Sequence, residues 1–196
     1  MKTKINKMFT KQEEALLKTL VCKTISKIRH DRFDNANVSF LRVTFFIKDD
    51  GVYELENCIE PTDFMWDDYG EEDVAVFKFH KVDDKGIDYK YGFNNYPKQI
   101  EMPIDELIKD IVIVEDSVKA YNKSNNKLVS EYDYVKGVIF VFADYKYCFS
   151  RGAWFSDDIV INKGVNPENK IGSIDKDWEW GEDRYSINKR TFRSLK

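Results

Sequence analysis

The sequence feature that most constrains the fold is the continuous apolar run Val138–Phe142, together with the two β-like segments that follow it. An unbroken run of β-branched and aromatic residues is typical of a strand that is buried on both faces. A short polar turn leads to a second strand at Tyr147–Ser150, and Ile159–Ile161 resumes the pattern after an aromatic corner. We therefore expect Val138–Lys163 to form a three-stranded meander at the centre of a sheet.

The N-terminal segment has the pattern of an amphipathic helix. Thr10 and Glu13 fit a capping box, in which each side chain accepts a hydrogen bond from a free backbone N–H group. Apolar residues then follow at helical spacing from Leu16 to Ile28. The sequence thus predicts one helix that begins at Thr10, packs its apolar face on the sheet, and ends near His30, whose charge would suit a helix C-terminus.

Residues after Asn37 alternate with the period of two that is typical of strands. Asp49–Gly51 predicts a hairpin turn, because glycine supplies the positive φ that such a turn needs. Val52–Cys58 is expected as the returning strand, with Tyr53 and Leu55 on its core side.

Helix, then hairpin, then further strands predicts a single α+β domain over residues 1–196. An N-terminal helix would pack on a largely antiparallel sheet of hairpins and the C-terminal meander. Lys123–Glu131 is the best candidate for a boundary between subdomains. The remaining expected elements are strands at Val74–Phe79, Ile87–Tyr91 and Ile111–Val114, short helices at Pro103–Ile108 and Glu115–Asn122, a loop at Lys123–Tyr134, and a last strand or helix at Tyr185–Leu195.

Composition favours a globular protein. The chain has 196 residues, of which 42% are apolar and 34% charged, and its formal net charge is −4. Net acidity disfavours nucleic acid as a partner and favours a basic protein. Two histidines and the widely spaced Cys22, Cys58 and Cys148 predict buried free thiols rather than a zinc site. Without a secretion signal or an apolar run of membrane-spanning length, we expect a cytoplasmic protein with no membrane partner and no cofactor.

Two segments combine carboxylates with large aromatic side chains. Residues 60–73 hold seven acidic and no basic residues, and residues 177–183 form a second such cluster. Like charges keep such a run solvated, whereas Trp and Tyr beside charge are typical of binding surfaces. The alternative is that Phe64 and Trp66 pack into the core while the acids face water. The candidate partner-binding residues are Asp63, Phe64, Trp66, Asp67, Asp68, Tyr69, Glu71, Glu72, Asp73, Trp178, Glu179 and Trp180.

Catalytic motifs are mostly absent, with one exception that indicates a metal-dependent nuclease. Asp63, followed by Asp88 and Lys90 in an expected strand, loosely resembles the PD-(D/E)xK nuclease pattern. In that chemistry two carboxylates hold a Mg²⁺ ion that activates water, and the lysine assists. The alternative is that Asp88 and Lys90 simply lie on the solvent face of the strand. We expect a protein that is not an enzyme and keep the nuclease as the alternative.

The region Tyr134–Tyr185, with YVKGVIFVFADYKYCFSRGAWFSDDIVINKG followed by DWEWGEDRY, resembles bacterial immunity proteins of polymorphic-toxin and contact-dependent inhibition systems. Those small proteins are often acidic, α+β and non-enzymatic. The resemblance implies a cytosolic protein that binds one cognate toxin and blocks its active site. The acidic surface would then face a basic toxin domain. A housekeeping or phage-derived domain with another partner is the remaining possibility.

Overall fold

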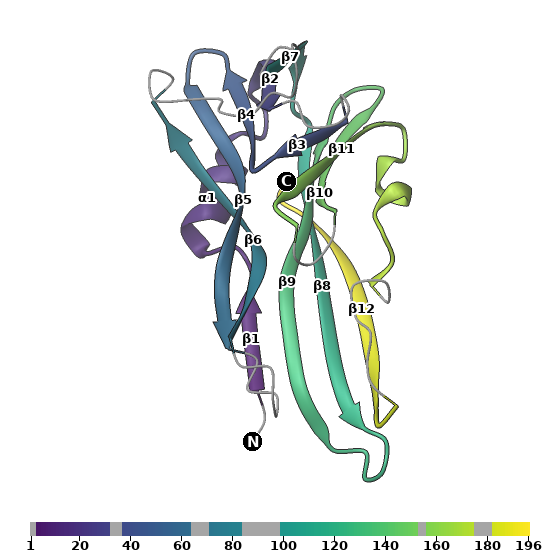
Figure 1. The fold of residues 1–196 in the computed structure, drawn as a ribbon. Coiled ribbons are helices and arrows are strands. Elements are labelled where there is room, and N and C mark those ends of the chain that lie inside the picture. The colour runs from purple at the N-terminus through teal and green to yellow at the C-terminus, as the bar shows by residue number, and fades with distance from the viewer. Residues whose placement is uncertain (1–2, 32–36, 64–70, 84–98, 153–155, 175–181) are drawn as a thin grey trace.

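Two twisted β-sheets dominate the structure, a computed structural model that describes residues 3–31, 37–63, 71–83, 99–152, 156–174 and 182–196 (Figure 1). About two thirds of the described residues lie in strands and only 9% in helical segments. The predicted α+β class is therefore wrong, because the protein is mainly β. The described helices are α1 (Lys11–Thr19) and the short 3₁₀ helix η2 (Pro167–Lys170).

Sheet A is organised around its long central strand, β9. Its strands, in order across the sheet, are β12 (Arg184–Ser194), β8 (Asp110–Asn122), β9 (Leu128–Val141), β10 (Lys146–Arg151), β11 (Asp158–Gly164) and β3 (Val38–Phe40), with β1 (Thr3–Lys7) also beside β9. On the edge of β9 away from β8, β1 pairs in parallel with Ser130–Tyr134, and β10 pairs antiparallel with Gly137–Val141. Between these two partners, Lys136 is an extra residue in the pairing with β8, so a β-bulge marks the change.

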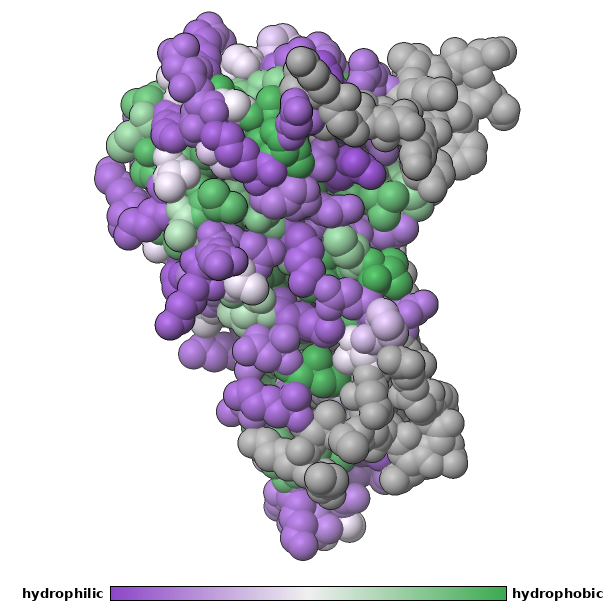
Figure 2. Space-filling view, turned by 90° about the vertical axis from the view of Figure 1, so that its left-hand side faces the viewer, coloured by the Kyte–Doolittle hydropathy of each residue, from purple (hydrophilic) through white to green (hydrophobic). Residues whose placement is uncertain are grey.

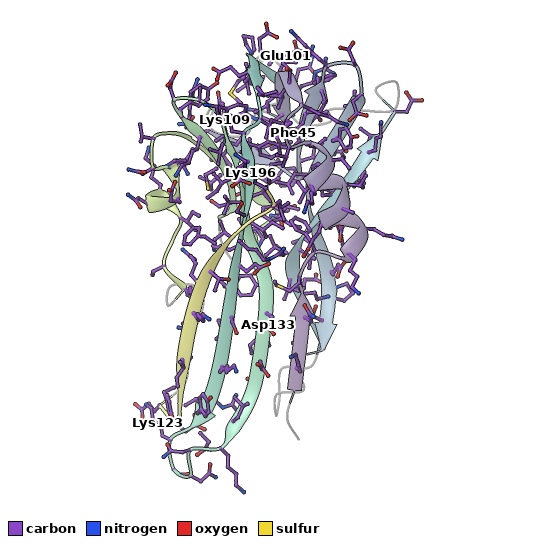
Figure 3. The ribbon with its side chains drawn as sticks, turned by 180° about the vertical axis from the view of Figure 1, so that it is seen from behind. Phe45, Glu101, Lys109, Lys123, Asp133 and Lys196 are labelled. Atoms are coloured by element: carbon purple, nitrogen blue, oxygen red, sulfur yellow. The ribbon has the colours of Figure 1, made fainter. Side chains whose placement is uncertain are left out.

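Sheet B has five antiparallel strands. In order across the sheet they are β6 (Glu71–Val82), β5 (Gly51–Asp63), β4 (Arg42–Ile47), β2 (Thr24–Asp31) and β7 (Gln99–Leu107). The two sheets share one hydrophobic core, in which Phe45 of β4 stacks on Phe140 of β9 with 4.8 Å between ring centroids. Phe149 of β10 meets both rings edge-on, at 5.2 and 5.7 Å. Figure 3 shows Phe45 in this densely packed part of the molecule.

The predicted meander is confirmed. β9, β10 and β11 pair consecutively in the middle of sheet A, and Val138, Ile139 and Phe140 are all buried. The predicted hairpin at Asp49–Gly51 is also confirmed, because it joins β4 to β5 and Gly51 has a φ of +134°. The core positions expected in the returning strand, such as Tyr53, are buried as well.

The N-terminal helix is much shorter than predicted. The capping box at Thr10 and Glu13 is present, but α1 ends at Thr19, and β2 takes up the second half of the expected helix. A register shift between Ile25 and Lys27 turns both Ile25 and Ile28 towards the core. This β-bulge produces a spacing of three between buried residues within a strand, and the sequence pattern was misread as helical for that reason.

Three further expectations in the middle of the chain are wrong. The expected helix at Pro103–Ile108 lies almost entirely in β7, that at Glu115–Asn122 lies in β8, and most of the expected loop at Lys123–Tyr134 is the start of β9. Proline is tolerated in β7 because this is an edge strand, where a missing N–H group breaks no ladder. The expected strand at Ile87–Tyr91 lies outside the described residues.

The helix predicted at Glu115–Asn122 is a strand because the acidic residues of this segment pair with the distant strand β12. Arg190 makes a bidentate pair with Asp116, at 2.6 and 2.7 Å, and the Asp116 side chain is fully buried. Arg193 binds both Glu115 of β8 and Glu14 of α1. These carboxylates stabilise a strand only because β12, 74 to 78 residues later, supplies the opposite charge.

Gly137 allows β9 and β10 to approach closely. A Cβ atom at this position would lie 2.8 Å from the backbone oxygen of Phe149. Because backbone cannot move aside as a side chain can, we expect Gly137→Ala to lower the free energy of unfolding by about 1–3 kcal/mol. Urea denaturation measures this loss. Gly172→Ala is the matched control, since a Cβ there meets nothing within 4 Å, and an equal loss in both variants would contradict the explanation.

His30 is a buried residue of β2, so its expected role as a charge at a helix C-terminus is wrong. Its side chain is 0% exposed, its Nδ1–H donates to the Asp31 carbonyl oxygen at 2.8 Å, and its Nε2 atom has no hydrogen-bond partner among the described residues. Burial lowers the pKa of His30, only partly offset by this hydrogen bond. The folded protein therefore holds the neutral imidazole.

Below the ordinary His pKa of about 6.5 the unfolded chain binds a proton at His30 that the folded protein does not bind. The stabilisation due to a neutral His30 is thus present above about pH 6.5 and is lost as the pH falls. Below about pH 6.5 we expect the free energy of unfolding to fall as the pH falls, by at most about 1.4 kcal/mol per pH unit. Urea denaturation of His30→Leu, which cannot titrate, should show a flatter profile; equal slopes would contradict the assignment.

Candidate functional site

The first candidate surface is the end of a two-stranded ribbon. β4 pairs with β5 only as far as Glu56, and beyond that point β5 pairs with β6 alone among the described strands. We call this extension, residues 57–63 and 71–77, the acidic ribbon. Its register places Asp63 opposite Glu71, and Glu72 and Asp73 follow on the same strand. The two ends of the predicted acidic-aromatic segment thus meet at one end of the ribbon.

Apolar packing holds the acidic ribbon against sheet A. Val74 and Val76 of β6 pack in one cluster with Ile5 of β1 and with Tyr132 and Tyr134 of β9. This contact lies on the half of β9 that pairs with β1 rather than with β10.

Polar contacts from β10 and β1 also hold the ribbon in place. The buried Arg151 of β10 donates to the backbone oxygen of Ala75 and lies 4.5 Å above the Tyr134 ring. Glu60 accepts from Lys7 of β1 at 2.8 Å and forms an ion pair with Lys78 at 2.9 Å. These two lysines lower the pKa of the Glu60 carboxyl group. The ribbon is therefore preorganised, and binding at its end would not have to order it.

The structure describes only part of the predicted partner-binding set. The backbones of Asp63, Glu71 and Glu72 lie in the paired strands at the ribbon end, and the side chain of Asp73 is exposed. The other predicted residues lie outside the described part of the chain; they are Phe64, Trp66, Asp67, Asp68, Tyr69, Trp178, Glu179 and Trp180.

The last two residues of the second acidic-aromatic cluster are exposed. Glu182 and Asp183 precede β12, and their backbone oxygens accept from the side chain and backbone of Lys123, at 2.7 and 2.9 Å. In Figure 1 the start of β12 and the end of the β5–β6 pair both lie towards the lower end of the molecule, where the N-terminus also lies. On the side that carries α1, hydrophilic residues predominate and apolar ones form small scattered patches (Figure 2).

A second candidate surface, which sequence reasoning missed, is a groove of about 530 Å³ on sheet A. Its floor is formed by β8 and β9, and residues of β1 and β12 line its sides. The lining includes Asn6, Ser117, Asp133, Ile187 and Lys189. The sequence signal that could have predicted this groove is the alternation of polar residues in β8 and β9. The predictions of a helix and a loop for these segments do not use that alternation.

A third polar cluster lies on sheet B around a buried carboxylate. Glu54 of β5 accepts from the Thr44 hydroxyl at 3.1 Å, and its side chain is only 5% exposed. His80 Nε2 lies 3.7 Å and the Arg42 guanidinium 3.9 Å from Glu54 Oε2. The Glu54 carboxylate raises the pKa of His80, partly offset by burial. Cys58 lies further along β5, and burial raises the pKa of its thiol to about 12, so it is no nucleophile at neutral pH.

Because the folded pKa of His80 is raised, the stabilisation it gains from Glu54 is fully present below about pH 6.5 and is lost as the pH rises through the folded value. In the unaltered protein we expect the free energy of unfolding to fall as the pH rises through the folded pKa of His80. This fall should be under about 1 kcal/mol, because His80 is 42% exposed, and it should be absent in His80→Gln. Thermal unfolding between pH 6 and 8 measures it. Glu54→Gln provides the control. In that background, adding His80→Gln should leave the pH dependence of the free energy of unfolding unchanged.

Among the described residues, no group of three His, Cys, Asp or Glu side chains is placed to hold a metal ion. Asp88 and Lys90 of the alternative nuclease site lie outside these residues, as does the side chain of Asp63. In the same ranges no helix has the length and apolar character needed to cross a membrane. Cys148 is buried as expected, whereas Cys22 is exposed.

Comparisons of the chain with protein-family models, with curated proteins and with solved structures found no match. The fold and the described surfaces define the class only as a mainly β protein that carries the acidic ribbon and the groove of sheet A.

Proposed function

We propose that this chain is a non-catalytic binding protein, and specifically an immunity protein that binds a cognate bacterial toxin in the cytoplasm through its acidic ribbon. The observation that carries the proposal is the pairing of Asp63 with Glu71 at the ribbon end. The register of β5 with β6 thus brings the acidic positions of both strands to one end of the ribbon. A basic partner would be complementary in charge to these positions, and complementary charge favours encounter and specificity.

Two further observations support a protein partner. The ribbon is held in place by Arg151 and by the ion pairs of Glu60, so little conformational entropy would be lost on binding. The exposed Glu182 and Asp183 add two acidic residues just before β12, whose start lies towards the same end of the molecule as the ribbon end. A toxin whose active site binds a polyanionic substrate would present the complementary basic groups, and an acidic surface would block that site.

The test is co-purification of the tagged protein with the product of the neighbouring toxin gene. We expect a stoichiometric complex that weakens at high salt, because exposed charge pairs are screened. Glu71→Lys combined with Glu72→Lys should reduce the association rate and the affinity strongly, and the variant toxin–immunity pair should lose protection in a cell-survival assay.

Asp83→Lys combined with Asp144→Lys is the matched control. It makes the same change in net charge at two exposed acidic residues outside the ribbon end. Equal effects of the two double variants would show that net charge alone matters. Unchanged binding of the Glu71 and Glu72 variant, with the protein still folded by circular dichroism, would remove the acidic ribbon as the contact surface.

A further inference from the structure

The groove on sheet A collects polar side chains from four strands into a single row. Lys189 of β12 pairs with Ser117 of β8, Ser117 pairs with Asp133 of β9, and Asp133 pairs with Asn6 of β1. All four residues line the groove, and because residues paired directly across neighbouring strands share a face, their side chains lie on one face of the sheet. Since neighbouring strands are about 4.8 Å apart, the row is about 14 Å long.

The groups in this row keep hydrogen-bonding capacity for a ligand. In the described part of the chain the Lys189 ammonium and the Ser117 hydroxyl form no hydrogen bond or ion pair. Among the described residues Asp133 forms one ion-pair contact, with Lys4 at 3.8 Å, and Lys4 is 57% exposed. The Asn6 side-chain oxygen accepts from the backbone N–H of Met8 at 3.1 Å, which holds this amide at the wall of the groove.

The other charges around the groove neutralise one another. Glu131 pairs with Lys119 at 3.2 Å, and Glu115 pairs with Arg193 at 2.6 Å. Without a strong field of either sign, the groove is poorly suited to a polyanion or to a highly charged peptide. A neutral ligand with many hydroxyl groups fits the mixture of donors and acceptors better.

Apolar surface lies beside the polar row on the same face. Ile187, which lines the groove, is 57% exposed. Two residues before Ile187 in β12, Tyr185 stacks on Tyr121 of β8 with 5.3 Å between ring centroids. Such surfaces can cover the C–H face of a sugar ring, while hydroxyl groups bind the polar row; ligand sites commonly combine an apolar lining with a few placed polar groups.

We propose that this groove binds a neutral oligosaccharide. Asp133 accepts hydrogen bonds from sugar hydroxyl groups, Lys189 and Asn6 donate to sugar oxygens, and Ser117 does both. The site is distinct from the acidic ribbon and does not depend on the function proposed for it.

Maltotriose, cellotriose and chitotriose are the probes, titrated into the ¹⁵N-labelled full chain and followed by NMR. We expect saturable shifts for at least one trisaccharide, centred on the amides of β8, β9 and β12 around Ser117. Asp133→Ala should weaken that binding by about tenfold or more, because it removes a charged hydrogen-bond acceptor, and should leave the melting temperature nearly unchanged.

Asp144→Ala is the matched control, because Asp144 is an exposed acid in the turn between β9 and β10, away from the groove. It should bind the same trisaccharide as the unaltered chain does. Absence of saturable shifts with all three probes would overturn the proposal. Shifts centred outside the groove, or equal affinities of the Asp133 and Asp144 variants, would overturn it as well.

Discussion

The rest of the structure depends on β9, which pairs with a different strand along each of its two halves. β9 is paired with β1 up to Tyr134 and with β10 from Gly137, and the bulge at Lys136 lies between them. Beyond the bulge, Val138 and Phe140 face the core shared with sheet B. Before the bulge, Tyr132 and Tyr134 face the acidic ribbon. One strand therefore supports two different packing layers. Both candidate surfaces are positioned by the half before the bulge, where Tyr132 and Tyr134 contact the ribbon and the alternate residues Glu131 and Asp133 line the groove.

Charge pairs then fix the order of the strands along the open edge of sheet A. The Asp116 carboxylate is buried, and its bidentate contact with Arg190 offsets the cost of desolvation. Arg193 connects β12 and β8 to α1 through Glu115 and Glu14. Removing one partner of such a buried pair leaves an uncompensated charge, which makes the placement of β12 beside β8 specific as well as stable.

The two proposed surfaces differ in their electrostatics because they differ in their strand partners. At the ribbon end one paired position, Asp63 opposite Glu71, joins two acidic residues, and neither strand has a basic residue there. On the groove face, carboxylates such as Glu131 find lysines on the neighbouring strand. The first arrangement favours a charged partner and the second a neutral one, although both are built from adjacent β-strands of one acidic chain.

The sequence by itself determined the elements whose cause is local. The meander after Val138 and the turn at Gly51 were predictable, because an apolar run and a required positive φ need no distant partner. The capping box at Thr10 was predictable too, but not the end of its helix, since the bulge in β2 gives Ile25 and Ile28 a helical spacing.

Only the tertiary structure determined which segments become strands through ion pairs with residues far away in the sequence. It also determined the groove that these strands form. Glu115 and Asp116 favour a strand only once β12 provides Arg193 and Arg190, and no local pattern contains that information. The polar row through Ser117 exists because four strands meet in register. The acidic composition of the ribbon was evident in the sequence, whereas the pairing that brings its two ends together came from the register of β5 with β6.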